Sequence, residues 1–289
     1  MKKAKQFELK LTTGVLRLGE RPLVMGILNL TQDSFSDGGF FNKPDVAVGR
    51  ALQMERDGAD ILDIGGESTR PGSEGVDAEQ ELRRVIPVIE RLRGRLTIPI
   101  SIDTQKAAVA EAAIAAGAQI INDVSAMRTD PRIGEVAART GAPLILMHMR
   151  GIPRTMQKGG FARDVMRDVS RGLREAATRA RKAGVKKGQI VLDPGIGFGK
   201  SFEQNCELLA KLPELARLGY PLLVGTSRKT FIGALLSGDR ERPVPPHLRT
   251  WGTAATVAAA VMGGAHIVRV HDVVEMGQVA RVANGLRLK

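Results

Sequence analysis

The feature that most constrains this chain is a unit that recurs along almost its whole length. In each unit a helix-like segment ends in glycine, and an apolar run follows within a few residues. Glycine is favoured just past a helix end because it adopts the left-handed conformation at little cost. The junction glycines are Gly58, Gly94, Gly117, Gly141, Gly184, Gly219 and Gly264. Together with an opening apolar run at residues 24–30, these junctions predict eight strands that alternate with helices.

The apolar runs after the glycines have the length of buried strands. They cover residues 61–66, 99–104, 119–125, 143–149, 190–196, 221–227 and 266–272. Segments between them carry apolar residues at helical spacing, such as Ala47, Ala51 and Met54. Eight alternating β and α units favour an α/β fold closed into a (β/α)₈ TIM barrel, with an open doubly wound sheet as the alternative.

Two segments lie outside this repeat. Apolar residues alternate within residues 7–18 on either side of Gly14, which predicts a short N-terminal β-hairpin within residues 1–20. Residues 237–251 are rich in proline and are expected to form a surface excursion. No linker or composition shift divides the 289 residues. We therefore expect a single barrel domain over residues 1–289, near the roughly 250 residues typical of this fold.

The composition limits the classes of partner. The formal net charge is +12 at pH 7, which attracts anions, but aromatic residues make up only 3% of the chain and can stack few nucleic-acid bases. We expect no nucleic-acid partner and keep a non-catalytic RNA-binding protein as an alternative.

The single cysteine, Cys206, forms no disulfide framework or thiolate metal cluster. The N-terminus lacks the apolar core of a signal peptide, and the longest apolar run, residues 254–268, is shorter than the ~20 residues of a membrane span. We expect a cytoplasmic protein with no membrane partner.

Polar residues gather where the predicted strands end. In a barrel of this type the site lies at the carboxyl ends of the strands. The residues at these positions are Asn29, Glu67, Ser68, Thr69, Arg70, Asp103, Asn122, Asp123, His148, Asp193, Lys229, Arg269 and His271. One or two could cap loops, but so many at the same topological position are difficult to explain by capping alone.

The chemistry of these residues divides into two kinds. One set offers carboxylate, amide and ammonium groups that suit a flat heterocycle with alternating donors and acceptors: Asp103, Asn122, Asp193 and Lys229. The other offers donors and positive charge that suit a phosphate or diphosphate: Asn29, Thr69, Arg70, Arg269 and His271. The glycine-rich residues 195–200 permit close backbone approach but have neither Rossmann nor P-loop spacing. The sequence shows no Ser-His-Asp triad, and its histidines lack metal-ligand spacing with a third partner.

Long motifs from residue 25 to residue 272 resemble those of the dihydropteroate synthase family of folate biosynthesis. They read MGILNL at 25–30, DSFSDGG at 33–39, DIGGESTRPG at 63–72, SIDT at 101–104, IND at 121–123, MHM at 147–149, DPGIGFGK at 193–200, SRK at 227–229 and RVHD at 269–272. The family is a (β/α)₈ barrel that joins 6-hydroxymethyl-7,8-dihydropterin diphosphate to 4-aminobenzoate and releases diphosphate by an SN1-like mechanism. Sulfonamides mimic aminobenzoate in this family, so the resemblance implies a sulfonamide-sensitive enzyme.

The resemblance also implies roles for individual residues. The pterin-binding residues would be Asp103, Asn122, Met147, Asp193, Phe198, Lys229 and Arg269, of which Asp103, Asp193, Lys229 and Arg269 are the catalytic ones. The diphosphate would bind Asn29, Thr69, Arg70, Arg269 and His271, with Asn29 as the ligand of a Mg²⁺ cofactor. The aminobenzoate would lie near Phe35, Pro71, Lys229 and Thr230. Family members are usually dimeric, so we expect a homodimer.

One departure and one alternative accompany the resemblance. Gln32 stands where the family usually has proline, which leaves the backbone of the first loop less restrained. A methyltransferase of the methyltetrahydrofolate type shares the barrel and some of the pterin-holding residues. The expected diphosphate-binding set argues against that alternative.

Overall fold

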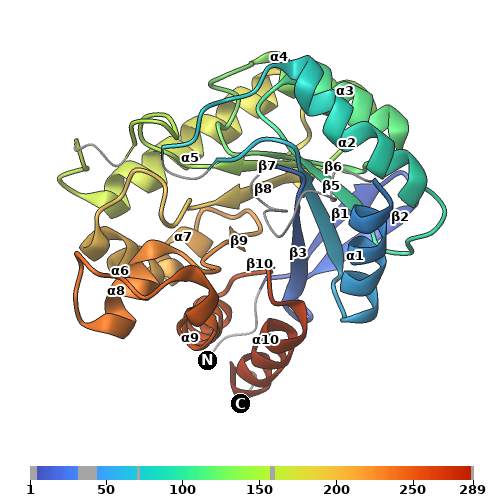
Figure 1. The fold of residues 1–289 in the computed structure, drawn as a ribbon. Coiled ribbons are helices and arrows are strands. Elements are labelled where there is room, and N and C mark those ends of the chain that lie inside the picture. Colours follow the sequence, from blue (N-terminus) through green and yellow to red (C-terminus); the bar gives the residue numbers. More distant parts are fainter. Residues whose placement is uncertain (1–4, 32–43, 70–71, 157–159, 288–289) are drawn as a thin grey trace.

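The computed structural model describes residues 5–31, 44–69, 72–156 and 160–287, and in them eight parallel strands form one sheet (Figure 1). The strands are β3 (Leu23–Asn29), β4 (Ile61–Gly65), β5 (Ile100–Asp103), β6 (Ile120–Asp123), β7 (Leu144–Met147), β8 (Ile190–Asp193), β9 (Leu223–Val224) and β10 (Ile267–Val270). Their order is β8-β7-β6-β5-β4-β3-β10-β9, and a parallel bridge between Leu192 and Leu222 joins the two ends. The predicted barrel is confirmed, and the open doubly wound sheet is excluded.

Helices follow the strands and surround the sheet (Figure 1). They are α1 (Pro44–Arg56), α2 (Ala78–Leu92), α3 (Ala107–Ala116), α4 (Arg132–Thr140), α5 (Val165–Lys182), α6 (Phe202–Ala210), α7 (Leu212–Ala216), α8 (Thr230–Ser237), α9 (Thr250–Met262) and α10 (Val273–Arg287), with short 3₁₀ helices η2 (Lys187–Gln189) and η3 (Pro246–Leu248). All seven junction glycines have a positive φ, between 73° at Gly141 and 130° at Gly117. The left-handed turn therefore separates helix from strand at each predicted junction.

Residues along each strand alternate between the two faces of the sheet. On β4, Leu62 and Ile64 belong to the core between the sheet and the helices, whereas Ile61 belongs to a second core inside the barrel. Because both faces are buried, the strands appear in the sequence as continuous apolar runs.

The side chains that point into the barrel change from apolar to polar along its axis. Near the amino ends of the strands the inward side chains are Met25, Ile61, Ile120, Ile145, Val191, Leu223 and Ile267. Two residues later on the same face of their strands stand Asp63, Asn122, Asp193 and Arg269. The barrel therefore presents an apolar floor and a polar mouth.

A two-stranded antiparallel sheet of β1 (Phe7–Leu11) and β2 (Gly14–Leu18) covers the floor. Leu9 and Leu18 are each 1% exposed and pack in the same core as the inward residues of the barrel. Gln189 fixes the hairpin, because its Oε1 accepts the Lys10 N–H at 3.0 Å and its Nε2 donates to the Lys10 carbonyl at 2.8 Å. The predicted N-terminal hairpin is confirmed.

The chain between α8 and α9 is largely exposed over residues 238–248, and only Arg249 at its end is buried. Arg249 donates to the carbonyl oxygens of Val244, at 2.5 Å, and Arg228, at 2.8 Å. This residue therefore attaches the segment to the loop that follows β9. Within the described ranges, no helix has both the length and the apolar character needed to span a bilayer.

Candidate active site

Arg269 lies at the centre of a polar network at the carboxyl end of the barrel. Its Nε donates to Asp63 Oδ2 at 2.6 Å and its Nη2 donates to Asp103 Oδ2 at 2.7 Å. Asn122 Nδ2 donates to the same oxygen of Asp63 at 3.0 Å. Burial lowers the pKa of Arg269, but Asp63 and Asp103 outweigh it and raise that pKa above its ordinary value. The network thus joins Asp103, Asn122 and Arg269, three of the residues predicted from the sequence.

Asp63 is the network member that sequence reasoning missed. It stands in the middle of β4, and its side chain is fully buried. A buried carboxylate needs a cationic or hydrogen-bonding partner, since an unpaired one is costly. An acidic residue within an apolar run therefore indicates that a cationic or hydrogen-bonding side chain lies beside it inside the barrel. Arg269 and Asn122 are those partners.

Two buried carboxyl groups at the strand ends have raised pKa values. Burial, with the charge of Asp63 and Glu81, raises the pKa of Asp103 to about 7 although Arg269 opposes the rise. Burial raises the pKa of Asp193 to about 6, against the hydrogen bond from the Gly195 N–H at 2.7 Å and the charge of Lys229. Asp103 Oδ1 is buried and accepts no hydrogen bond from the described part of the chain. That oxygen is therefore available to a donor on a ligand.

Lys229 approaches the same space from the loop after β9. Its Nζ lies 3.8 Å from the centroid of the Phe198 ring, which is a cation–π distance. A β-carbon at Gly197 would lie 2.9 Å from Lys229 Cδ, so glycine at this position lets the lysine pass. Burial and Arg269 lower the pKa of Lys229 to about 8, although Asp193 and Asp103 oppose the change. Within the glycine-rich residues 195–200, it is therefore the side chain of Lys229 that approaches the backbone closely.

An apolar wall lies beside these polar groups. Its buried side chains are Val124, Met147, Met149, Met156 and Phe198. Met147 and Phe198 were predicted as pocket walls, whereas Met149 and Met156 were not. They come from the loop that follows β7, where the sequence gives no periodicity to assign them a direction. An apolar wall beside an edge of carboxylate, amide and ammonium groups suits a planar heterocycle.

The groups expected to bind an anion come from β3, β4 and β10. His271 directly follows β10, and its Nδ1 lies 2.9 Å from Ser227 Oγ, which also accepts the His271 N–H at 3.2 Å. Thr69 follows β4, and Thr230 begins α8. Neither threonine makes a hydrogen bond or ion pair with another predicted site residue within the described ranges. Phe35, Arg70, Pro71 and Gln32 lie outside the described residues.

Asn29 ends β3 and is the expected metal ligand. Its Oδ1 lies 3.7 Å from the place that a β-carbon on Gly65 would occupy, so the amide faces the neighbouring strand end. In the described part of the chain no three His, Cys, Asp or Glu side chains form a group that could hold a metal. Mg²⁺ prefers oxygen ligands and commonly binds through few protein groups plus substrate phosphates. Asn29 fits a cation that arrives with a diphosphate rather than one held by protein groups alone.

Two polar residues at strand ends have structural roles instead. The ring of His148 packs against α5, where a β-carbon at Gly172 would lie 2.5 Å from His148 Cδ2. Burial, with nearby cationic side chains, lowers the pKa of His148 to about 3. Asp123 accepts the N–H groups of Ser125, at 2.8 Å, and Met127, at 2.6 Å, and so caps the loop after β6. The capping explanation fits Asp123, whereas the imidazole of His148 caps no loop within the described ranges and packs against α5 instead.

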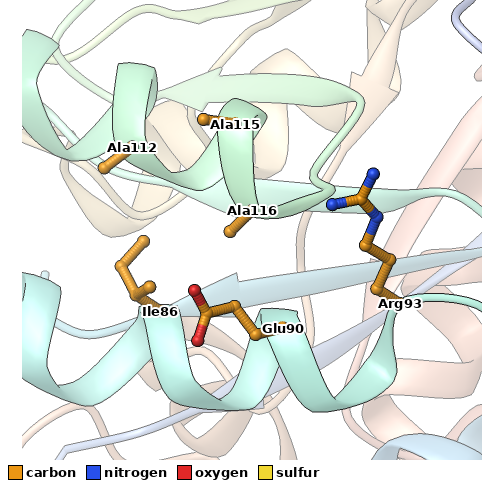
Figure 2. A pocket seen from close by; sticks show the side chains of 6 residues that line it. All are labelled: Ile86, Glu90, Arg93, Ala112, Ala115 and Ala116. Atoms are coloured by element: carbon orange, nitrogen blue, oxygen red, sulfur yellow. The ribbon is translucent and has the colours of Figure 1, made fainter.

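A hollow lies on the outer surface, between α2 and α3 (Figure 2). Its volume is about 450 Å³, and it is lined by Ile86, Glu90, Arg93, Ala112, Ala115 and Ala116. Figure 2 shows three alanine side chains of α3 facing Ile86 and Glu90 of α2. These residues lie in the last half of each helix, toward the amino ends of the strands, and none belongs to the network of Arg269. The candidate site is therefore the mouth of the barrel.

Known proteins are similar to this chain in sequence and in fold. The model of the pterin binding enzyme family matches residues 25–271. A dihydropteroate synthase from Synechocystis sp. is 53% identical over 268 residues, which are 93% of this chain and 91% of the relative. The solved structure of Yersinia pestis dihydropteroate synthase in a sulfonamide drug complex has a TM-score of 0.91 and 44% identity, and the match covers 98% of this chain and 100% of that one. The Xanthomonas albilineans dihydropteroate synthase with 4-aminobenzoic acid has a TM-score of 0.90 and 44% identity, with 99% and 100% covered.

Proposed function

The chain belongs to the dihydropteroate synthase family of pterin binding enzymes, and on that premise we propose that it joins 6-hydroxymethyl-7,8-dihydropterin diphosphate to 4-aminobenzoate. The products are 7,8-dihydropteroate and diphosphate. The protein is an enzyme and a transferase, as are its relatives named dihydropteroate synthase.

The observation that carries the proposal is the hydrogen-bonded group of Arg269, Asp63, Asp103 and Asn122 beside an apolar wall. The pterin ring would stack on Met147 and Phe198 of that wall. Its amino and ring N–H groups would donate to carboxylate oxygens such as Asp103 Oδ1, which is buried and has no partner among the described residues. The polar edge of the pocket would be completed by Asp193, Asn122, Lys229 and Arg269. The arrangement supplies both donors and acceptors, as a pterin requires.

In the proposed mechanism the bond between the exocyclic methylene carbon and the diphosphate oxygen breaks first. The electron pair leaves with the diphosphate, and the cation that remains is conjugated with the pterin ring. The ionised carboxylates of Asp103 and Asp193 stabilise this electron-poor ring, and such preorganised charge is effective in a site shielded from water. The amino nitrogen of aminobenzoate then bonds to the methylene carbon and releases a proton to solvent. An arylamine is already nucleophilic, so the reaction needs no strong base.

The leaving diphosphate carries negative charge that must be neutralised. We assign this role to Thr69, Arg70, Arg269 and His271, with Asn29 contributing its amide. The contact of His271 Nδ1 with Ser227 fixes the orientation of the imidazole. A bound Mg²⁺ would add positive charge to the diphosphate, and Asn29 is the residue of this chain that would hold it.

The second substrate would enter from the side of the loops that follow β3 and β4 and of the start of α8. Its carboxylate would lie near Lys229 and Thr230, where the first N–H groups of the helix are available to an anion. Phe35 and Pro71 would border its ring. A relative of this chain is solved with 4-aminobenzoic acid and another in a sulfonamide drug complex, which supports a sulfonamide-sensitive site here.

The test is a reaction of the purified protein with both substrates, in which diphosphate and dihydropteroate are quantified separately. The proposal expects one diphosphate per dihydropteroate. Methyl transfer from methyltetrahydrofolate to a corrinoid without diphosphate release would instead identify the methyltransferase alternative. Salt-dependent RNA binding that survives both Arg70→Ala and Lys229→Ala, without synthase activity, would identify an RNA-binding protein.

We also propose that the protein is a cytoplasmic homodimer. Four exposed apolar side chains support an interface on α8, η3 and α9: Leu235 (54%), Leu236 (45%), Leu248 (58%) and Trp251 (82%). Exposed apolar clusters commonly mark protein contacts. Sedimentation should give a dimer for the wild type and for Val15→Glu, a control at an exposed position of the hairpin, and a monomer for Trp251→Glu. A monomeric wild type would contradict the dimer.

A further inference from the structure

Three charged side chains meet below the loop that follows β4. Lys106 Nζ donates to Glu67 Oε2 at 2.9 Å and to Glu81 Oε2 at 2.6 Å. Glu67 stands two residues past the end of β4, Glu81 lies on α2, and Lys106 directly precedes α3. The three residues, here called the Lys106 cluster, therefore join three separate elements of the barrel.

The Lys106 cluster also fixes both ends of the loop. Glu67 Oε1 accepts the N–H of Val76 at 3.1 Å, so one side chain ties the first residue of the segment 67–76 to its last. A β-carbon at Gly75 would lie 2.9 Å from Glu67 Oε1, and one at Gly66 would lie 2.9 Å from Glu81 Cγ. The backbone at both ends thus packs directly on the two carboxylate side chains.

The charges of the cluster are largely withdrawn from water. The exposed fractions of the side chains are 0% for Glu81, 11% for Glu67 and 21% for Lys106. Two carboxylates that face one ammonium at this depth repel each other once the ammonium is removed. Glu81 is held in a helix, whereas Glu67 is in a loop, so the repulsion would displace Glu67 and the segment it closes.

The segment is adjacent to the candidate active site. Thr69, a predicted diphosphate ligand, is two residues from Glu67. On the other side, the Lys106 N–H donates to Thr104 Oγ1 at 3.2 Å, and Thr104 directly follows Asp103. The cluster therefore lies between the strand end that carries Asp103 and the loop that carries Thr69.

We propose that Lys106 is a positioning residue for the proposed reaction. Through Glu67 and Glu81 it holds the segment that carries Thr69 in place for the diphosphate, and it contacts neither substrate. This inference rests on the proposed function. If Lys106 served overall stability alone, its removal would weaken the binding of every ligand equally. If it positions the loop after β4, its removal weakens the binding only of ligands that contact this loop.

The test compares the wild type with Lys106→Met, which keeps the aliphatic stem and removes the charge. Amide hydrogen exchange in residues 67–76 should be at least about tenfold faster in the variant, because those amides lose the fixed loop ends. Binding of the pterin diphosphate and kcat/KM should fall by about tenfold or more, a loss on the scale of one charge-assisted hydrogen bond. Binding of 6-hydroxymethylpterin, which has no diphosphate, should stay within about twofold. The variant keeps the backbone N–H of residue 106 that bonds to Thr104 beside Asp103, and the other proposed partners of the pterin lie farther away, on other strands.

Two further variants complete the experiment. Lys106→Arg keeps a cation between the carboxylates and should restore most of the diphosphate affinity. Lys211→Met makes the same substitution in an exposed pair of α6, where Lys211 Nζ lies 2.7 Å from Glu207 Oε1, and should change neither the exchange rates nor the affinities. If Lys106→Met does not fold, Glu67→Gln replaces it, because the amide still accepts the Val76 N–H but the ion pair is lost.

Equal losses of pterin and pterin diphosphate affinity would overturn the positioning role, as would unchanged exchange in residues 67–76. Failure of the proposed function is separate, since it would appear as absent synthase activity in the wild type. In that case the hydrogen exchange still decides whether Lys106 fixes the segment.

Discussion

The guanidinium of Arg269 donates from Nε to Asp63 Oδ2 over 2.6 Å, although the two residues are 206 positions apart in the chain. The contact joins β10 to β4, the two strands that flank β3 in the sheet. With Asp63 occupying Nε and Asp103 occupying Nη2, the guanidinium plane is held in one orientation. The remaining nitrogen, Nη1, has no acceptor among the described residues and is the group available to a substrate. Asp63 therefore orients the arginine that the proposed reaction needs.

Asp63→Asn should lower kcat/KM by about 10- to 100-fold, the effect of losing a charge-assisted hydrogen bond of about 1.5–3 kcal/mol. The amide can still accept one hydrogen bond, so the protein should remain folded. Steady-state kinetics measure the change. Asp45→Asn is the matched control, because Asp45 is 81% exposed and pairs with Arg91 on the surface. Equal activities of the two variants would argue against the orienting role.

Arg269→Ala should abolish turnover, because the proposal gives Arg269 contacts to both halves of the first substrate. It also leaves Asp63 and Asp103 as unpaired buried carboxylates, and breaking a buried pair costs about 3–5 kcal/mol of stability. Circular dichroism at the assay temperature should first establish that the variant is folded. Near-normal turnover in the folded variant would refute the assignment of Arg269.

The pH dependence of kcat/KM should be bell-shaped. Asp193 and Asp103 have pKa values raised to about 6 and about 7, so the carboxylates that stabilise the ring form only as the pH rises through this range. Lys229 has a pKa lowered to about 8, so its ammonium group is lost as the pH rises further. Activity should therefore increase up to about pH 7 and decrease above about pH 8.

Lys229→Arg tests the basic limb, because a guanidinium keeps its charge throughout this range. The decrease above about pH 8 should disappear in this variant, whatever its absolute rate. The exposed Lys211→Arg should keep the wild-type profile. A basic limb that persists unchanged in Lys229→Arg would assign it to another group.

Removal of divalent cations by a chelator should abolish activity, and added Mg²⁺ should restore it. Asn29→Ala should raise the Mg²⁺ concentration for half-maximal activity by about tenfold or more, because loss of even an outer-shell partner of a metal typically costs about 10- to 100-fold in affinity. Asn284→Ala, on α10, is the control and should leave that concentration unchanged. Full activity in the presence of chelator would show that the cation is not required.

Leu9→Ala should lower the free energy of unfolding by about 2–5 kcal/mol, because it empties a buried position in the floor of the barrel. Denaturant titration measures the loss. At 25 °C kcat/KM should stay within about twofold, since the floor and the mouth are at opposite ends. Val15→Ala, at a side chain 50% exposed on the same hairpin, should have little effect on stability. A large loss of activity in folded Leu9→Ala would contradict this separation.

Seven of the eight strands could be predicted from two independent signals, a junction glycine and the apolar run after it, and the first strand from its apolar run alone. Their ends could not. The run at 190–196 contains β8, which stops at Asp193 because the Gly195 N–H turns back to that carboxylate. The run at 221–227 contains only Leu223–Val224 as a strand. The apolar composition of a run does not show at which residue the backbone stops hydrogen-bonding to the neighbouring strand.

Part of the site was equally predictable. Asp103, Asn122 and Arg269 were expected together because parallel strands end at one edge, and they share one network. His148 was grouped with them although alternation along β7 turns it away from Met147, toward α5. The binding roles of all these residues stay predictions, as do those of Phe35, Arg70 and Pro71.

The closure of the barrel between β8 and β9 has a mechanical consequence. Among the described residues a single parallel bridge, between Leu192 and Leu222, joins the sheet there, and β9 itself has two residues. This junction, here called the seam, is the most easily deformed part of the barrel sheet, because widening it breaks few backbone hydrogen bonds. Asp193 ends the strand on one side of the seam, and Lys229 follows the strand on the other. A change in the width of the seam would therefore change the separation of these two opposite charges at the mouth of the barrel.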